Sequence, residues 1–259
     1  MSDFLETIRE SVLTRVQHMR IEERGTIVNT IDFCEMFRQT KSPIFISEIK
    51  FSSPSRGVIY RGDLSPVQIA AQYKQHGAHA LSVLTEPSFF KGDIEYIRQI
   101  RTQLPDCPIL LKDFVLSPLQ IKQAQVYGAS AVLLIVGFLE PALLRVLHAY
   151  ALSLGLTPLV EVHDAAELEV ALTLQPKVIG INNRNLKTLK IDLNTSRALI
   201  PLIPEEIFTV CESGIDSVSA IQEMSALGFD GFLIGSHLMQ SAHPGEALAA
   251  LLQSNNHEG

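Results

Sequence analysis

The chain has 259 residues, 46% of them hydrophobic, with a formal net charge of −7 at pH 7 and a pI of about 5.6. This length and apolar content permit a large core, and α/β barrels often use about 250 residues for one domain. The acidic balance, without a Lys/Arg block, gives no support for a nucleic-acid or an anionic membrane partner. The three cysteines, Cys34, Cys107 and Cys211, form neither a metal spacing nor a disulfide framework, which suits a reducing cytoplasm.

The first segment is predicted to be helical. Apolar residues recur at helical spacing after a cap at Ser2 and before a stop at Gly25. They are Leu5, Ile8, Val12, Val16 and Met19. A second short stripe contains Ile31, Cys34 and Phe37. Residues 1–43 are therefore expected to form a helical extension that packs on the domain that follows.

Neither a signal peptide nor a transmembrane helix is expected. The residues after Met1 include Asp3 and Glu6 in place of a basic region and an apolar block. The most apolar run, Ala129 to Leu139, is too short to span a bilayer.

From Ile44 onward, apolar β-type runs alternate with amphipathic helical stretches. Most of these helices begin at a cap or a first-turn proline, as at Ser65-Pro66, and several end at a glycine such as Gly77. Strands that are apolar throughout and separated by helices imply a parallel sheet covered on both faces, and eight such units predict an α/β fold, a single (β/α)₈ TIM barrel over residues 44–259. A doubly wound open sheet is the alternative. The predicted strands are Ile44 to Glu48, Ala80 to Leu84, Pro108 to Lys112, Ala131 to Val136, Thr157 to Val162, Val178 to Asn182, Ile207 to Glu212 and Gly231 to Ile234.

Polar or charged residues end six of the eight apolar runs. Chemistry in such a barrel belongs at the C-terminal ends of the strands, so these side chains are predicted to surround one pocket. An isolated strand-end charge is often part of a structural ion pair, but six strands that converge on one mouth favour catalysis or ligand binding. The residues are Glu48, Lys50, Lys112, Glu161, Asn182, Arg184, Glu212, Ser213, Gly235 and Ser236.

Two lysines are candidates for proton transfer. Lys50 and Lys112 come from alternate strands that face the predicted cavity, so desolvation and mutual repulsion are expected to lower the pKa of one ammonium towards neutral pH. Such a lysine can donate a proton, while Glu48 and Glu161 keep the other lysine charged or serve as bases. The alternative is two Lys/Glu pairs that merely neutralise each other.

Two Gly/Ser pairs indicate a phosphate site. Ser213-Gly214 follows the seventh strand, and Gly235-Ser236 follows the eighth and opens a short helical stretch. Glycines let backbone N–H groups approach an anion, and a helix N-terminus favours negative charge. Phosphate is commonly bound at this place in barrels of this kind, and Arg184 is expected nearby.

Two other residues are assigned structural roles. His163 follows Glu161, but no second histidine stands at ligand spacing, so it is expected to be a loop residue and not a metal ligand. Cys211 precedes Glu212 and should point away from the barrel lumen as a packing residue.

The chain resembles the indole-3-glycerol phosphate synthases, barrel enzymes of tryptophan biosynthesis. The matching segments run in order from about Ile44 to Met239. Two departures are Phe51, where the family often has a basic or polar residue, and a looser match before Ile31. The segments are SEIKFSSPSRG at 47–57, SVLTEPSFFKG at 82–92, PILLKDF at 108–114, GASAVLLI at 128–135, LVEVHD at 159–164, IGINNRNL at 179–186, ESGI at 212–215 and GFLIGSHLM at 231–239.

The resemblance implies the substrate 1-(2-carboxyphenylamino)-1-deoxyribulose 5-phosphate, which closes its ring and loses CO₂ and water to give indole-3-glycerol phosphate. It implies that Lys112 is the general acid on the carbonyl or a clamp on the carboxylate, with Lys50 as the other candidate acid. Glu161 would be the base in dehydration, assisted by Asn182. The residues that orient the lysines and bind the ribulose hydroxyls would be Glu48, Glu212 and Ser213.

The resemblance also implies a phosphate grip and an apolar slot for the aromatic ring. The phosphate residues would be Ser53, Arg184, Gly214, Gly235 and Ser236. The ring slot would consist of Pro54, Phe90, Phe114 and Leu133. No metal and no organic cofactor is required, and we expect a cytoplasmic monomer for which association with other enzymes of the pathway is an option.

Two other functions are compatible with such a barrel. A different phosphate-sugar isomerase or lyase is one, although an isomerase of the neighbouring pathway step would be expected to use a Cys/Asp pair that the strand ends lack. A non-catalytic barrel that binds a phosphate ligand or a partner subunit is the other. It predicts the loss of a lysine or of Glu161, and all of these residues are present.

Overall fold

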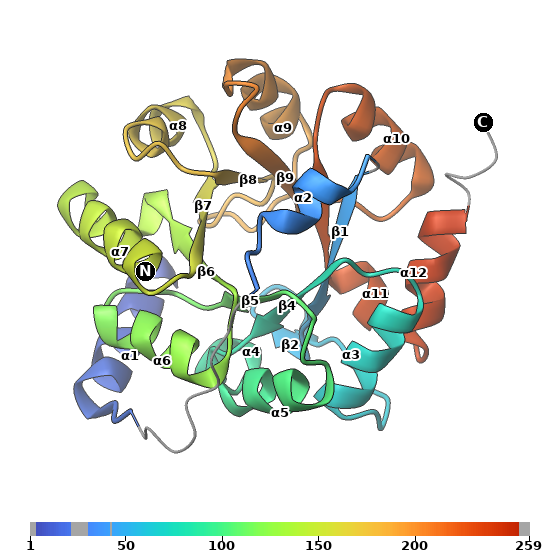
Figure 1. Ribbon diagram of the computed structural model, residues 1–259, viewed down its shortest axis with the longest axis horizontal. Helices are drawn as coiled ribbons and strands as arrows, with labels where there is room; N and C mark the ends of the chain where they lie inside the picture. Colours follow the sequence, from blue (N-terminus) through green and yellow to red (C-terminus); the bar gives the residue numbers. More distant parts are fainter. Residues whose placement is uncertain (1–3, 22–30, 42, 254–259) are drawn as a thin grey trace.

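Eight parallel strands close into a barrel at the centre of the molecule (Figure 1). The computed structural model describes residues 4–21, 31–41 and 43–253. The strands follow the order β1-β10-β9-β8-β7-β6-β5-β4 around the barrel. All eight predicted strands are confirmed to within one residue at either end, and the open-sheet alternative is wrong because the sheet closes on itself. The strands are β1 (Ile44–Ile49), β4 (Ala80–Leu84), β5 (Ile109–Lys112), β6 (Ala131–Ile135), β7 (Thr157–Val162), β8 (Val178–Asn182), β9 (Phe208–Glu212) and β10 (Gly231–Ile234).

The strands are buried along nearly their whole length, as expected for a parallel sheet covered by helices. Their register aligns the polar strand ends. Glu161 pairs with Gly180 across β7 and β8, and Asn182 pairs with Glu212 across β8 and β9. Three successive strands therefore each place a polar side chain within two residues of the same register position, near their C-terminal ends.

Helices surround the barrel, and several begin as the sequence predicted. Ser65 and Gln68 form a capping box at the start of α3, and Ser117 and Gln120 form another at the start of α6. The α8 helix is capped by Asp164. The helices are α1 (Phe4–His18), α2 (Glu35–Gln39), α3 (Pro66–Gln75), α4 (Pro87–Phe90), α5 (Glu95–Gln103), α6 (Pro118–Tyr127), α7 (Pro141–Ser153), α8 (Ala165–Leu172), α9 (Asn194–Leu199), α10 (Val218–Ala226), α11 (Ser236–Met239) and α12 (Pro244–Gln253), with the 3₁₀ turns η1 (Val136–Phe138) and η2 (Ile200–Leu202).

Cys211 lies between β9 and the helical layer. Its Sγ is 3.3 Å from Ser196 Oγ on α9 and accepts a hydrogen bond from Asn183. The thiol is buried, and burial raises its pKa to about 11. The prediction that Cys211 is a packing residue outside the lumen is confirmed.

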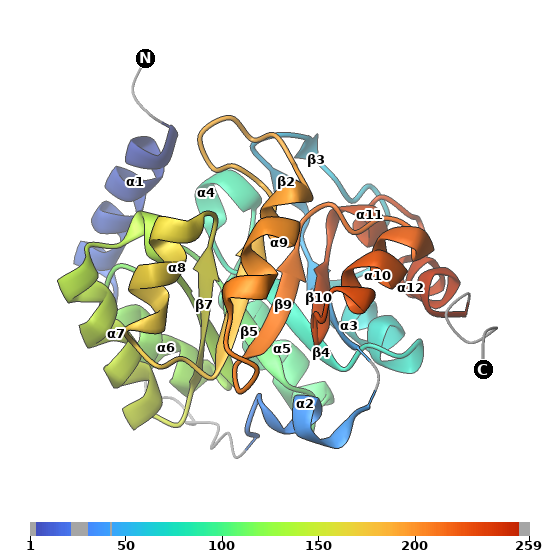
Figure 2. The same ribbon diagram turned by 90° about the horizontal axis from the view of Figure 1, so that it is seen from above.

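The two described parts of the N-terminal segment lie at opposite ends of the barrel (Figure 2). The α1 helix contacts the loops at the C-terminal ends of β5 and β6, because Arg15 Nη2 pairs with Asp113 at 2.7 Å and the Arg9 guanidinium lies over the Phe138 ring. The α2 helix lies at the other end, where Phe37 stacks on Phe208. The predicted helix ends at Ser2 and Gly25 lie outside the described residues, and the division at residue 43 stays a prediction.

A small antiparallel hairpin follows β1 and was not predicted. It consists of β2 (Ser52–Ser53) and β3 (Gly57–Val58). Ser52 Oγ donates to the carbonyl of Gly57, which fixes the hairpin at its base. No helix in the described ranges is both long enough and apolar enough to cross a membrane.

Candidate active site

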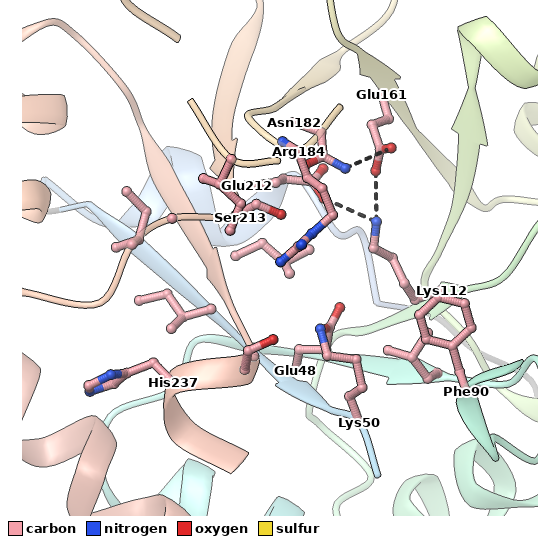
Figure 3. A pocket seen from close by; sticks show the side chains of 18 of the residues that line it. Glu48, Lys50, Phe90, Lys112, Glu161, Asn182, Arg184, Glu212, Ser213 and His237 are labelled. Carbon is pink, nitrogen blue, oxygen red and sulfur yellow. Dashed lines mark hydrogen bonds and ion pairs between the residues drawn. The ribbon is translucent and has the colours of Figure 1, made fainter. Parts of the chain in front are cut away.

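A cavity of about 250 Å³ opens at the C-terminal ends of the strands (Figure 3). The structure brings fourteen of the sixteen predicted site residues to its wall. The two others belong to the β2–β3 hairpin: Ser53 is buried with its hydroxyl 3.4 Å from Ser55 Oγ, and Pro54 is exposed. The predicted residues that lie in the wall are Glu48, Lys50, Phe90, Lys112, Phe114, Leu133, Glu161, Asn182, Arg184, Glu212, Ser213, Gly214, Gly235 and Ser236.

Lys112 is held between two carboxylates. Its Nζ donates to Glu161 Oε2 at 2.7 Å and to Glu212 Oε2 at 3.1 Å. Burial alone would lower the pKa of Lys112, but the charges of Glu161 and Glu212 outweigh burial and raise it. The prediction that the pKa is lowered towards neutrality is therefore wrong for Lys112. Each of the two lysines is paired with glutamates, Lys112 with Glu161 and Glu212 and Lys50 with Glu48. Lys50 Nζ lies 2.5 Å from Glu48 Oε1.

The two carboxylates around Lys112 have opposite pKa shifts. Burial would raise the pKa of Glu161, but the charge of Lys112 and contacts with His163 bring it below the usual range. Burial and the neighbouring Glu161 raise the pKa of Glu212 to about 8, against the effect of Lys112. Glu212 therefore holds a proton to higher pH than Glu161 does.

Two glycines make room for two of the carboxylates. A Cβ at Gly180 would lie 2.2 Å from Glu212 Oε1, and a Cβ at Gly235 would lie 2.3 Å from Glu48 Oε1. Both distances are far below van der Waals contact, so any larger residue at these strand ends would displace an acidic side chain. Glu212 Oε1 is buried and has no hydrogen-bond partner in the described part of the chain.

His163 lies in the loop after β7, as predicted, but its contact with the wall residue Glu161 was not predicted. Its Nε2 lies 3.3 Å from Glu161 Oε1, within ion-pair distance although not aligned for a hydrogen bond. Glu161 Oε1 also accepts a hydrogen bond from Asn182 Nδ2 at 3.0 Å. Residues two apart on a strand share a face, so the position of His163 two residues after Glu161 already indicated that both side chains lie on the same side.

Basic residues gather opposite this acidic cluster. Arg184 is half-buried, and its pKa is lowered by burial and by the neighbouring charge of Arg56, a wall residue that was not predicted. Ser213 and Gly214 both have left-handed backbone conformations, with φ of 62° and 87°. The chain therefore turns sharply after β9, in the wall of the cavity that the two arginines also line.

Aromatic rings form the apolar side of the cavity. The ring centroids of Phe90 and Phe114 are 6.1 Å apart, and Phe138 meets Phe114 edge-on at 5.1 Å. Leu133 on β6 lies in the same wall. Other wall residues that were not predicted include Asp113, Ile135, Ile215, Asp216, His237 and Gln240. In the residues that the structure describes, no three His, Cys, Asp or Glu side chains gather as in a metal site.

Comparison with solved structures identifies the same fold in distant proteins. The α subunit of tryptophan synthase from Legionella pneumophila superposes with a TM-score of 0.63 at 16% identity and covers 85% of this chain and 96% of its own. A protein described as KGPDC from Streptococcus mutans gives a TM-score of 0.64 at 12% identity, with 82% and 97% covered. At such low identity these similarities show the barrel fold alone.

Comparison by sequence identifies close relatives over the full length. The family model described as Indole-3-glycerol phosphate synthase matches residues 2–251. The indole-3-glycerol phosphate synthase of Acidithiobacillus ferrooxidans is 47% identical over 262 residues, with 97% of this chain and 99% of the relative covered. That of Albidiferax ferrireducens is 43% identical over 263 residues, with 97% and 98% covered. The chain therefore belongs to the indole-3-glycerol phosphate synthase family, the carboxy-lyases that form indole-3-glycerol phosphate in tryptophan biosynthesis.

Proposed function

We propose that the cavity binds 1-(2-carboxyphenylamino)-1-deoxyribulose 5-phosphate and closes its indole ring with Lys112 as the acid. The aromatic carbon that bears the carboxylate attacks the ribulose carbonyl carbon. Lys112 protonates the carbonyl oxygen as the new C–C bond forms, and loss of CO₂ from the attacking carbon restores the aromatic ring. The observation that supports this role is the position of the Lys112 ammonium in the cavity wall between Glu161 and Glu212.

The second half of the reaction is a dehydration, and Glu161 is the proposed base. The hydroxyl on the former carbonyl carbon leaves as water after a lysine gives it a proton, either Lys112 once it has been reprotonated from solvent or Lys50, while Glu161 removes a proton from the neighbouring CH₂ carbon. Glu161 is suited to this role because it remains a carboxylate and is held by the Asn182 amide. Lys50, paired with Glu48, is the alternative proton donor for either step. Ser213 and Glu212 are proposed to bind the ribulose hydroxyls.

The phosphate is proposed to bind at the basic side of the cavity. Arg184 supplies a charged donor, and the backbone N–H groups at Gly214, Gly235 and Ser236 supply neutral ones. The aromatic ring of the substrate then lies on the opposite wall, against Phe90, Phe114 and Leu133. Ser53 and Pro54 lie outside the wall, so a role for them would need the β2–β3 hairpin to move.

The role of Lys112 is tested by following the rise of indole fluorescence when substrate is added. The chain contains no tryptophan, so the background to the indole fluorescence of the product comes from tyrosine alone. Lys112→Ala is expected to reduce kcat by at least about 10³-fold, because acid catalysis is lost and the Glu161 carboxylate loses a counter-ion. Inhibition by inorganic phosphate should change little. Lys122→Ala on α6 removes a lysine outside the cavity and is the matched control; a Lys112→Ala variant with the turnover of this control would refute the proposal.

A further inference from the structure

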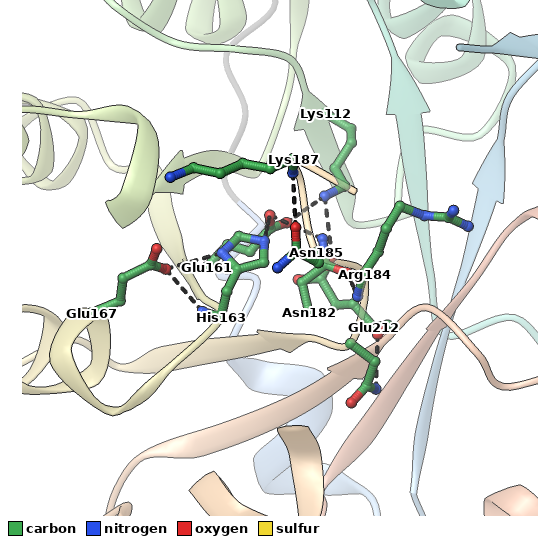
Figure 4. A network of polar contacts seen from close by, with 10 residues as sticks. Lys112, Glu161, His163, Glu167, Asn182, Arg184, Asn185, Lys187 and Glu212 are labelled. Atoms are coloured by element: carbon green, nitrogen blue, oxygen red, sulfur yellow. Dashed lines mark hydrogen bonds and ion pairs between the residues drawn. The ribbon is translucent and has the colours of Figure 1, made fainter. Parts of the chain in front are cut away.

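His163 and Glu167 form a charged pair behind the proposed base (Figure 4). Glu167 Oε2 accepts a hydrogen bond from the backbone N–H of His163 at 2.8 Å and lies 2.9 Å from its Nδ1. The opposite ring nitrogen, Nε2, lies 3.3 Å from Glu161 Oε1. The Glu167 carboxylate thus holds the imidazole ring at Nδ1. The opposite edge of the ring, with Nε2, faces the Glu161 carboxylate in the cavity.

Two further contacts fix the position of Glu167. Its backbone N–H donates to the capping carboxylate of Asp164 at 2.9 Å. A Cβ at Gly137 in η1 would lie 2.2 Å from Glu167 Oε1, so only glycine leaves space for this side chain. The Glu167 side chain is only 20% exposed, and the His163 side chain 12%. The two side chains are therefore held in a defined, largely buried contact, unlike an ion pair between two exposed side chains.

The charges around His163 favour an imidazolium. Burial alone would lower the pKa of His163, but Glu161 on its own strand and Glu167 on α8 outweigh burial and raise it to about 10. Lys112 on β5 pairs with the other oxygen of Glu161. This raised pKa favours the charged form of the ring at neutral pH.

We propose that His163, anchored by Glu167, is a positioning residue that holds Glu161 in place as a carboxylate during the reaction. When Lys112 turns to the substrate, Glu161 retains only the neutral amide of Asn182 on the cavity side. A buried carboxylate with one neutral donor is costly, and a fixed cation behind it offsets that cost. This inference rests on the role proposed above for Glu161.

Glu167→Gln tests the pair with little change of shape, because the amide oxygen still accepts from the backbone N–H of His163. We expect kcat to fall about tenfold with a much smaller change in KM, as for the loss of one charged hydrogen bond. With Glu167 neutral, the pKa of His163 decreases, so the loss of activity that follows deprotonation of His163 should move to lower pH. A Glu212→Gln background separates this limb from the one that Glu212 produces near pH 8. Glu169→Gln removes the same charge from an exposed position of α8 and should leave both kcat and the pH profile unchanged.

A second measurement does not depend on activity. In protein labelled with ¹⁵N-histidine, the NMR signal that disappears in His163→Asn is assigned to His163 among the eight histidines. That signal should report an imidazolium at pH 8 in the unmodified enzyme and a neutral ring in Glu167→Gln. A neutral His163 at pH 7, or a Glu167→Gln variant with the kcat and pH profile of Glu169→Gln, would overturn the inference. Full activity in Glu161→Gln would instead refute the role proposed for Glu161.

Discussion

Glu161 on β7 and Glu212 on β9 bind the same ammonium, with their Oε2 atoms 2.7 and 3.1 Å from Lys112 Nζ. Both side chains are almost fully buried, yet only Glu161 also contacts a second cation, His163. This asymmetry explains why the pKa of Glu161 falls while burial raises that of Glu212 to about 8. The surroundings thus shift the pKa values of two chemically identical groups in opposite directions.

The first prediction concerns the alkaline limb of the pH–rate profile. Above about pH 8 Glu212 ionises, and the additional negative charge holds Lys112 more tightly as an ammonium. We expect kcat to decrease as pH rises through this value. Glu212→Gln resembles the protonated acid, so it should retain activity at neutral pH and lose this limb. A limb that persists unchanged in Glu212→Gln would assign it to another group.

The same group affects stability, and the sign follows from its pKa. The folded state holds the Glu212 proton up to about pH 8, whereas an unfolded glutamate loses its proton near pH 4.5. Between these values the folded state binds more protons, so the contribution of Glu212 to the free energy of unfolding decreases as pH rises. Urea denaturation at pH 5, 6.5 and 8 should show this decrease in the unmodified enzyme and a smaller one in Glu212→Gln.

The second prediction concerns Gly180, beside Glu161 in the strand register. In Gly180→Ala the new methyl group would meet Glu212 Oε1 at 2.2 Å and Leu159 Cδ2 at 2.7 Å. We expect a loss of about 1–3 kcal/mol in the free energy of unfolding and a fall in kcat as Glu212 moves away from Lys112. In a Glu212→Ala background the same substitution should cost less than half as much, because the oxygen is gone. Equal costs in both backgrounds would show that Glu212 is not the obstacle.

The barrel was predictable from sequence because its signals are local. Apolar runs and capping residues such as Ser65 and Ser117 set the limits of strands and helices within a few neighbouring positions. The family motifs and the rule for strand ends identified most of the cavity wall. Predicting the wall from strand ends works because a parallel barrel places all of these ends on one side.

The charge state of the site was not predictable in this way. The pKa of Lys112 depends on Glu161 and Glu212, which lie 49 and 100 positions further along the chain. Their distances from Nζ follow from the tertiary structure alone. Ser53 and Pro54 failed to reach the wall for a similar reason, since the hairpin after β1 turns them away while it brings Arg56 to the cavity.

The third prediction concerns Arg56, which the sequence analysis did not single out. It lies in the cavity wall, close enough to Arg184 for its charge to lower the pKa of that residue. A bound phosphate would relieve this repulsion, so we expect Arg56→Ala to raise KM about tenfold with a small effect on kcat. Inhibition by inorganic phosphate should weaken in parallel. Arg61→Ala, an exposed arginine outside this cavity, is the matched control, and equal KM values in the two variants would count against a phosphate contact.

The fourth prediction concerns the attachment of α1 to the barrel. Asp113, a wall residue, accepts hydrogen bonds from Arg15 on α1, from Thr85 and from the backbone of Phe114. Arg15→Ala removes the charged contact from α1 but leaves Asp113 with two donors, so we expect the helix to loosen while the barrel stays intact. Amide hydrogen exchange in α1 should accelerate by about tenfold, as for the loss of one charged hydrogen bond.

The control for this experiment is Arg38→Ala at the other end of the barrel. Arg38 also pairs with an aspartate, Asp32, at 2.8 Å, but it lies on α2, far from the cavity mouth. The Arg38→Ala substitution should leave amide hydrogen exchange in α1 unchanged. If α1 covers the substrate, kcat/KM should fall in Arg15→Ala and not in Arg38→Ala, because only the first variant frees the helix beside Asp113. Unchanged exchange in Arg15→Ala would mean that α1 is held by its other contacts, among them the stacking of Arg9 on Phe138.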